Sequence, residues 1–205
     1  MARDTRSIVK MSRREGYALH PKAHKALVKK PNPPGQGGGR GFRSKPSQYA
    51  IQLREKQKVK RLYGLLERQF RKLMVEAGKT QGRSGERLLQ LLELRADNAV
   101  YRAGFAPSRR AARQLVTHGH FLINGRRFDI PSLRVGQGDK LELRPKSHKS
   151  EYFKKLEDTS PAPSDHPSWM KVDRKKVSFE ITGVPARDEA EPDINEQLIV
   201  EYYSR

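Results

Sequence analysis

The sequence predicts an α+β protein. It consists of a basic, extended N-terminal arm and a helical domain, plus an inserted α/β module with an antiparallel sheet. Three observations favour this class. Apolar residues recur at helical spacing between residues 47 and 118 and alternate with polar ones further on, as at Leu141 and Leu143. Asn124-Gly125 is the strongest short signal for a β-hairpin. The stretch PNPPGQGGGRG, which starts at residue 31, predicts no regular structure.

The arm, residues 1–46, is expected to be extended. Basic side chains are spread along it, and the proline- and glycine-rich stretch lies near its end. One interpretation is a disordered tail. The other is a segment that becomes ordered when its charges lie along a polyanion. His20 and His24 have the spacing of a metal-binding pair on a helix, but two histidines without further ligands make a poor site, so no metal is predicted.

A helical domain is predicted for residues 47–94. Ser47 can cap a helix that runs to about Leu62, and Gly64 interrupts it. A second amphipathic helix follows, which Gly78 is expected to close. The leucines between residues 88 and 92 supply another apolar face, which we expect to be core.

The central module, residues 95–145, is predicted to contain two short helices, a hairpin and a further strand. Gly104 ends the first helix, because the position after a helix needs a positive φ that glycine adopts freely. Ser108 caps the second helix, which has a core-facing stripe. A turn at residues 136–139 leads into the last strand.

Basic residues are concentrated on the second helix of this module. Arg109, Arg110 and Arg113 lie within one turn, so three guanidinium groups are expected to share one exposed face near a helix N-terminus, where the dipole favours an anion. Phosphate is the expected occupant. The alternative is a merely solvated face, but the basic hairpin tip nearby favours phosphate.

The remaining chain predicts a second domain over residues 95–189 and a segment, 190–205, that rejoins the helical domain. Tyr152, Phe153 and Leu156 have helical spacing, a proline-rich loop follows, and residues 177–181 alternate as a strand that joins the sheet of the module. The last residues are expected to form a helix that packs on the N-terminal helices, although their β-branched and aromatic content leaves a strand open.

Composition limits the possible functions. The 205 residues include 43 Lys and Arg against 23 Asp and Glu, a net charge of +20, which implies a polyanionic partner. Residues 151–205 carry 12 acidic and 8 basic side chains, so the partner is expected on the first three quarters. The absence of cysteine excludes disulfides, thiolate catalysis and cysteine-ligated metal. No apolar run approaches membrane length and no signal peptide is expected.

Several motifs resemble a known family. The pattern L-x-x-R-x-D-N from Leu92, S-R-R-x-A-R-Q-L-V-x-H-G-H from Ser108 and N-G-R from Asn124 closely resemble the RNA-binding module named after small-subunit ribosomal protein S-four. The motifs SRREG from Ser12 and PPGQ from Pro33, together with parts of residues 49–70 and the C-terminus, resemble the S-four family itself. Many bacterial members bind zinc through four cysteines near the N-terminus, so this chain resembles a cysteine-free variant without that site, and no cofactor is expected.

The resemblance implies a structural, non-enzymatic constituent of a bacterial-type small ribosomal subunit, in the bacterial cytoplasm or in an organelle. The family binds directly and early to a multi-helix junction in the 5′ domain of 16S-type rRNA and nucleates subunit assembly. It lies near the channel through which mRNA enters, and it touches a neighbouring ribosomal protein in a contact that influences accuracy. Expected partners are therefore small-subunit rRNA, neighbouring ribosomal proteins and mRNA, with no membrane and no small-molecule substrate.

Charge and resemblance together give the candidate residues. Arg95 and Asp97 are expected to form a structural pair that orders the module. An acidic surface suits a protein neighbour, although a solvated tail is the alternative; its residues are Asp188, Glu189, Glu191, Glu196 and Glu201. The candidate RNA-binding residues, of which the two histidines can also be explained by packing, are Arg3, Arg13, Arg14, Lys22, Arg40, Arg43, Arg54, Lys56, Lys58, Arg61, Ser108, Arg109, Arg110, Arg113, Gln114, His118, His120, Asn124, Gly125 and Arg126.

Two other functions use the same module: an RNA-modifying enzyme and a factor that rescues stalled ribosomes. An enzyme needs a catalytic domain with a positioned acid or nucleophile. Outside the module only short segments remain, no catalytic set stands out, and the glycines of GQGGGRG lack the strand-then-helix context of a nucleotide loop. A rescue factor would not need residues 1–90.

Overall fold

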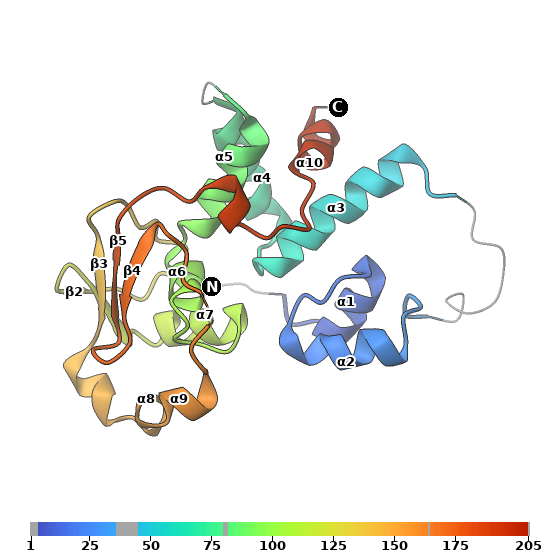
Figure 1. The fold of residues 1–205 in the computed structure, drawn as a ribbon. Coiled ribbons are helices and arrows are strands. Elements are labelled where there is room, and N and C mark those ends of the chain that lie inside the picture. Colours follow the sequence, from blue (N-terminus) through green and yellow to red (C-terminus); the bar gives the residue numbers. More distant parts are fainter. Residues whose placement is uncertain (1–3, 36–44, 80–81, 164, 205) are drawn as a thin grey trace. The chain divides into compact units, whose positions relative to one another are not determined.

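The chain forms two compact units, each built around its own secondary structure (Figure 1). The computed structural model describes residues 4–35, 45–79, 82–163 and 165–204. Unit 1 is Met1–Leu88 with Asp193–Arg205, and unit 2 is Leu89–Pro192. All five strands of the described residues lie in unit 2, where they form one antiparallel sheet, whereas unit 1 is helical. The predicted α+β class is confirmed. None of the described helices is long and apolar enough to cross a membrane.

Two helices lie where the sequence predicted an extended arm. They are α1 (Ile8–Glu15) and α2 (Pro21–Lys29). The prediction is therefore wrong for these segments, because a high density of Lys and Arg does not oppose a helix; both have good helix propensity. Met11, Leu19 and Ala23 bury an apolar side of this helix pair.

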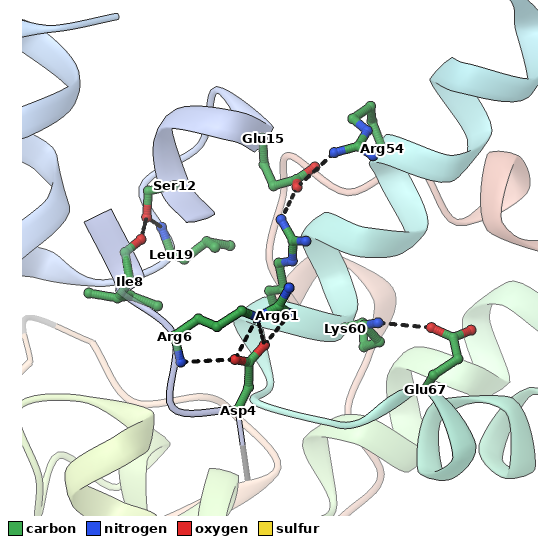
Figure 2. Close-up of polar contacts among 10 residues, drawn as sticks. All are labelled: Asp4, Arg6, Ile8, Ser12, Glu15, Leu19, Arg54, Lys60, Arg61 and Glu67. Atoms are coloured by element: carbon green, nitrogen blue, oxygen red, sulfur yellow. Dashed lines mark hydrogen bonds and ion pairs between the residues drawn. The ribbon is translucent and has the colours of Figure 1, made fainter. Parts of the chain in front are cut away.

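Specific polar contacts fix these two helices. His20 caps α2, since its Nδ1 accepts the Lys22 N–H at 3.1 Å. The Ser12 hydroxyl, which is fully buried, donates to the Ile8 carbonyl at 2.8 Å and accepts the Leu19 N–H at 3.3 Å (Figure 2). One serine thus joins α1 to the loop that leads into α2.

The other helices of unit 1 largely follow the prediction. They are α3 (Gln48–Leu62), α4 (Glu67–Lys79), α5 (Ser84–Glu93), which continues into unit 2, and α10 (Glu196–Tyr203). Ser47 caps α3 by accepting the Ala50 N–H, and Gly64 follows with φ of 66°. Gly78, expected to close α4, lies one residue inside it. The C-terminal segment is the predicted helix and packs on α3 (Figure 1).

A charge cluster of two buried lysines and a half-exposed carboxylate joins α3, α4 and α10. Lys56, only 3% exposed, donates to both carboxylate oxygens of Glu67 at 2.9 Å, and Lys60 donates at 2.8 Å. The Tyr203 hydroxyl donates to the same carboxylate at 2.8 Å. Burial raises the pKa of Glu67, but these donors outweigh it and lower the pKa to about 2. The ammonium groups can be buried because Glu67 supplies their counter-charge.

The sheet of unit 2 has the order β2-β1-β3-β5-β4. Its strands are β1 (Phe121–Ile123), β2 (Arg126–Arg127), β3 (Lys140–Leu143), β4 (Met170–Asp173) and β5 (Ser178–Ile181). Asn124 and Gly125 form the predicted hairpin turn with φ of 48° and 78°. The strand expected after residue 176 joins the sheet beside β3, as predicted, whereas β4 had no prediction.

Helices cover this sheet and complete the core of unit 2 (Figure 1). They are α6 (Ala96–Arg102) and α7 (Arg109–Thr117), then η2 (Pro145–Lys149), α8 (Glu151–Lys154) and α9 (Leu156–Thr159). The short η3 (Arg187–Glu189) buries no residue. The helix predicted from Tyr152 onward is divided at Lys155. The largest fully buried side chains in this core are Phe105, Phe121, Leu141, Phe179 and Ile181.

Replacing Glu67 by glutamine should lower the free energy of unfolding by about 2 kcal/mol at neutral pH, because two buried ammonium groups lose their counter-charge. The folded pKa of about 2 lies below the ordinary value of 4.5, so the carboxylate's contribution is complete above pH 4.5 and is lost as the pH falls toward 2. Urea unfolding of the variant should therefore show a shallower loss of stability over this range.

Glu157→Gln is the matched control, because Glu157 is exposed on α9 and has no ion pair within the described residues. It should retain the wild-type acid profile. Identical profiles for wild type and Glu67→Gln would contradict the role given to Glu67.

Candidate nucleic-acid interface

A buried polar network positions α7, the helix predicted to bind phosphate. Glu93, at the end of α5 and 1% exposed, accepts Arg102 Nε at 2.9 Å and Nη2 at 2.8 Å. Asn98 Nδ2 donates to the same carboxylate at 2.7 Å, while its Oδ1 accepts Arg109 Nε at 2.8 Å. The network therefore ties the end of α5 to α6 and to the first residue of α7.

Arg109 is held inside this network. Its Nη2 donates to Glu191 at 2.7 Å, its guanidinium lies 4.6 Å from the Tyr101 ring centroid, and its side chain is 13% exposed. Burial raises the pKa of Glu191, but Arg109 and then Arg102 outweigh it, so that pKa lies below its usual value. A carboxylate of the same chain thus stands beside the N-terminus of α7, where phosphate was predicted.

Arg113 is also engaged within the chain. Arg95 Nε and Nη2 donate to the two carboxylate oxygens of Asp97 at 3.0 and 2.9 Å, and Arg113 Nη1 donates to one of them at 3.2 Å. The structural pair expected from the sequence is present and has a third member. The prediction of three exposed guanidinium groups is wrong for Arg109 and Arg113, because spacing along a helix does not reveal which carboxylates approach it.

The exposed face of α7 is formed by Arg110, Gln114 and His118. These residues are four apart, so they lie along one ridge of the helix, which we call the α7 ridge. Gly125 and Arg126, at the hairpin tip, are exposed as well. In unit 2 these are the predicted residues most accessible to a ligand.

The other predicted residues of unit 2 have structural contacts. Ser108 is buried and caps α7 by accepting the Ala111 N–H. The Asn124 side chain donates to Asp139 at 2.8 Å and accepts the Lys140 N–H at 2.9 Å. His120 Nδ1 lies 3.0 Å from Ser147 Oγ, and burial, followed by His118 and Arg144, lowers its pKa.

In unit 1, Glu15 forms ion pairs with two of the predicted arginines, Arg54 and Arg61. Its side chain is fully buried, its Oε1 lies 3.3 Å from Arg54 Nη1, and the same oxygen contacts Arg61 Nη1 (Figure 2). Burial raises the pKa of Glu15 despite both arginines, and burial also lowers the pKa of Arg61. Arg54 is 43% exposed whereas Arg61 is 8% exposed, so only Arg54 offers much surface to a ligand.

The remaining predicted lysines and arginines of unit 1 are also of two kinds: some have contacts within the chain, and others are exposed. Lys56 is buried against Glu67, and Lys58 pairs with Glu55 at 2.8 Å and donates to the Asp193 carbonyl at 2.6 Å. Arg13 donates to the carbonyls of Lys30 and Asn32, both at 3.0 Å. Two predicted residues are exposed, Arg14 and Lys22. Arg3, Arg40 and Arg43 lie outside the described residues.

The acidic residues expected to contact a protein mostly hold the chain itself together. Glu189 accepts the N–H groups of Ser168 and Ala186 at 2.5 and 3.1 Å. Glu201 accepts Gln52 Nε2 at 2.8 Å, and Glu196 lies against Gly85, where an added Cβ would come within 2.6 Å of its Cγ. Asp188 is exposed. Among the described residues, no group of three or more His, Cys, Asp or Glu could hold a metal ion.

Comparison with known proteins identifies the family. Residues 3–93 match the family described as Ribosomal protein S4/S9 N-terminal domain, and residues 94–141 match the S4 domain. The chain is 48% identical over 206 residues to Small ribosomal subunit protein uS4 of Roseiflexus castenholzii and 49% identical over 205 residues to that of Chlorobium phaeovibrioides, with both chains fully covered. This chain belongs to the uS4 family. The predicted family membership is confirmed, and the part matching the S4 domain contains α6, α7, β1, β2 and the first two residues of β3.

Some basic residues of unit 2 were not selected from the sequence. Arg127, Lys146 and Lys149 are exposed, and Arg144 is partly exposed. The signal available for three of them was the run R-P-K-S-H-K, which follows the predicted strand at Leu141 and Leu143 and carries three cations and no acid. They bear on the surface described below.

Replacing Arg109 by glutamine should lower the free energy of unfolding by about 2 kcal/mol, because Glu191 and Asn98 lose a buried donor. Arg126→Gln removes the same charge from the exposed hairpin tip and should change stability by less than about 0.5 kcal/mol. Chemical unfolding of both variants would check this. Equal effects would show that Arg109 does not support unit 2.

Proposed function

We propose that this chain is a structural, non-enzymatic rRNA-binding protein of the small ribosomal subunit. The observation that carries the proposal is the full-length match to proteins named small ribosomal subunit protein uS4. The net charge of +20, the exposed α7 ridge and the exposed basic hairpin tip support it, because a polyanion needs cations that are accessible on the surface.

The surface residues fit recognition of the RNA backbone and shape. Side chains cannot read the narrow major groove of A-form RNA, so proteins contact phosphates and 2′-hydroxyls instead. In unit 2 we assign this role to Arg110, Gln114, His118 and Arg126. In unit 1 we assign it to the exposed basic residues Arg14, Lys22 and Arg54.

The internally paired arginines have a different role in this proposal. Arg61, Arg109 and Arg113 are fixed by Glu15, Glu191 and Asp97 respectively. They hold the helices that carry the exposed cations. Less side-chain and backbone freedom is then lost on binding, which favours affinity.

The finer parts of the function rest on the family resemblance. We propose that the chain binds a multi-helix junction in the 5′ domain of the rRNA, nucleates assembly and contributes to translational accuracy with a neighbouring ribosomal protein. It would do so in the bacterial cytoplasm, near the channel through which mRNA enters. Asp188 is the exposed acidic residue of the predicted protein-contact set.

The direct test is equilibrium binding of the purified chain to the isolated 5′ domain of small-subunit rRNA, over a salt series and with tRNA as competitor. Tight binding that resists tRNA is expected. Binding that tRNA abolishes would show that the charge binds RNA without selectivity and would overturn the proposed function.

Arg110→Gln and Arg126→Gln should each weaken this binding and lower the slope of log K against log salt by about 0.7 to 0.9, the value for one lost phosphate contact. Lys171→Gln is the control, because Lys171 is exposed on β4 directly opposite Glu180. Its slope should match that of the wild type. Equal slopes for all three variants would show that the α7 ridge and the hairpin tip do not contact RNA.

A further inference from the structure

The register of the sheet brings basic segments together at one end of unit 2. Phe121 pairs with Leu143, Glu142 pairs with Ser178, and Leu122 pairs with Arg127. The first residues of β1 and β5 therefore lie at the same end of the sheet as the last residues of β2 and β3. We call this surface the basic end; its residues are Arg127, Arg144, Lys146, Lys149, Lys175 and Lys176.

The backbone that carries the two η2 lysines is fixed. Arg144 N–H donates to the His120 carbonyl at 2.8 Å, and Ser147 Oγ lies 3.0 Å from His120 Nδ1. Leu143 N–H donates to the Val177 carbonyl at 3.1 Å, which links β3 to the chain after Lys176. These contacts hold η2 against the sheet, so the backbone positions of its lysines are set before any ligand binds.

Lys146 and Lys149 project from the same side of η2. Residues three apart lie above one another in a 3₁₀-helix, because it has three residues per turn. Ser147, between them, turns toward His120 instead and is buried. Two lysines are thereby presented on one side of η2.

Arg109 and Arg113 form ion pairs with carboxylates of the same chain, whereas the lysines of the basic end have weak ion pairs or none among the described residues. No described carboxylate lies within ion-pair distance of Lys146, Lys149 or Lys175. Lys176 is 82% exposed, and its ion pair with Asp173 is long, with 3.9 Å between Nζ and Oδ2. The charge of this surface is therefore available to a ligand.

Arg127 connects the basic end to the α7 ridge. A Cβ built on Gly119 would lie 2.9 Å from Arg127 Nε, so this guanidinium crosses the turn that follows α7. Gly119 has φ of 67°, which favours glycine at this close approach. Accessible cations thus continue from the helix to the end of the sheet.

We propose that the basic end is an RNA-backbone docking surface that continues the α7 ridge, and that Lys146 and Lys149 contact phosphates of the same rRNA. This proposal rests on the proposed function. An RNA backbone fits better than a protein, because a protein interface needs apolar anchors. The exposed large apolar residues of unit 2, Ile130 and Val184, do not belong to the basic end.

The test compares two double variants that remove the same charge from unit 2. In Lys146→Gln/Lys149→Gln the η2 pair is lost. In Lys140→Gln/Lys171→Gln the lost lysines both lie opposite Glu180 on the sheet. Salt-dependent binding to the 5′-domain rRNA should show a slope lower by about 1.4 to 1.8 for the η2 variant, for two lost contacts, and little change for the control.

Hydroxyl-radical footprinting gives a second readout. The η2 variant should lose protection of a stretch of RNA backbone that Arg110→Gln still protects. Equal salt slopes for the two double variants, or an unchanged footprint, would overturn the proposal while leaving specific rRNA binding by the wild type intact.

Failure of the proposed function would look different, since wild type itself would then lack tRNA-resistant rRNA binding. Phosphatidylserine vesicles test the other polyanionic surface. If wild type bound these vesicles through Lys146 and Lys149 while the η2 variant bound rRNA normally, the basic end would be a lipid surface and the proposal would be wrong.

Discussion

The structure depends on pairing buried cations with carboxylates of the same chain. Lys56 and Lys60 share Glu67, Arg61 contacts Glu15, and Arg102 contacts Glu93. A buried cation left without a counter-charge costs several kcal/mol, so each of these carboxylates is needed where it is.

This distribution separates two kinds of basic residue. Arginines such as Arg109 and Arg113, with large planar groups that donate in two directions, connect helices to carboxylates from other segments. Exposed lysines such as Lys146 and Lys149 remain hydrated on the surface. The internal acids are offset by internal cations, so they leave the positive charge of the outer surface in place.

The fold was predictable where local chemistry decides it. Ser47 and Ser108 cap helices, and Asn124-Gly125 forms the hairpin, because caps and tight turns depend on the residues within them. The arm at residues 8–29 was not predictable in this way, because its helices depend on burial of Met11 and Ala23 and on contacts of Ser12. Strand β4 is four residues long and is defined by pairing with β5, a contact that has no local signal.

The helix that carries the candidate site was predictable, but the orientation of its side chains was not. Spacing placed Arg109, Arg110 and Arg113 on neighbouring positions of one helix, which is correct. Only the tertiary structure brings Glu191 to Arg109, from a position 82 residues later in the chain, and Asp97 to Arg113. The charge pattern of a helix therefore predicts which segment is basic, while the tertiary structure decides which of its cations face carboxylates of the same chain.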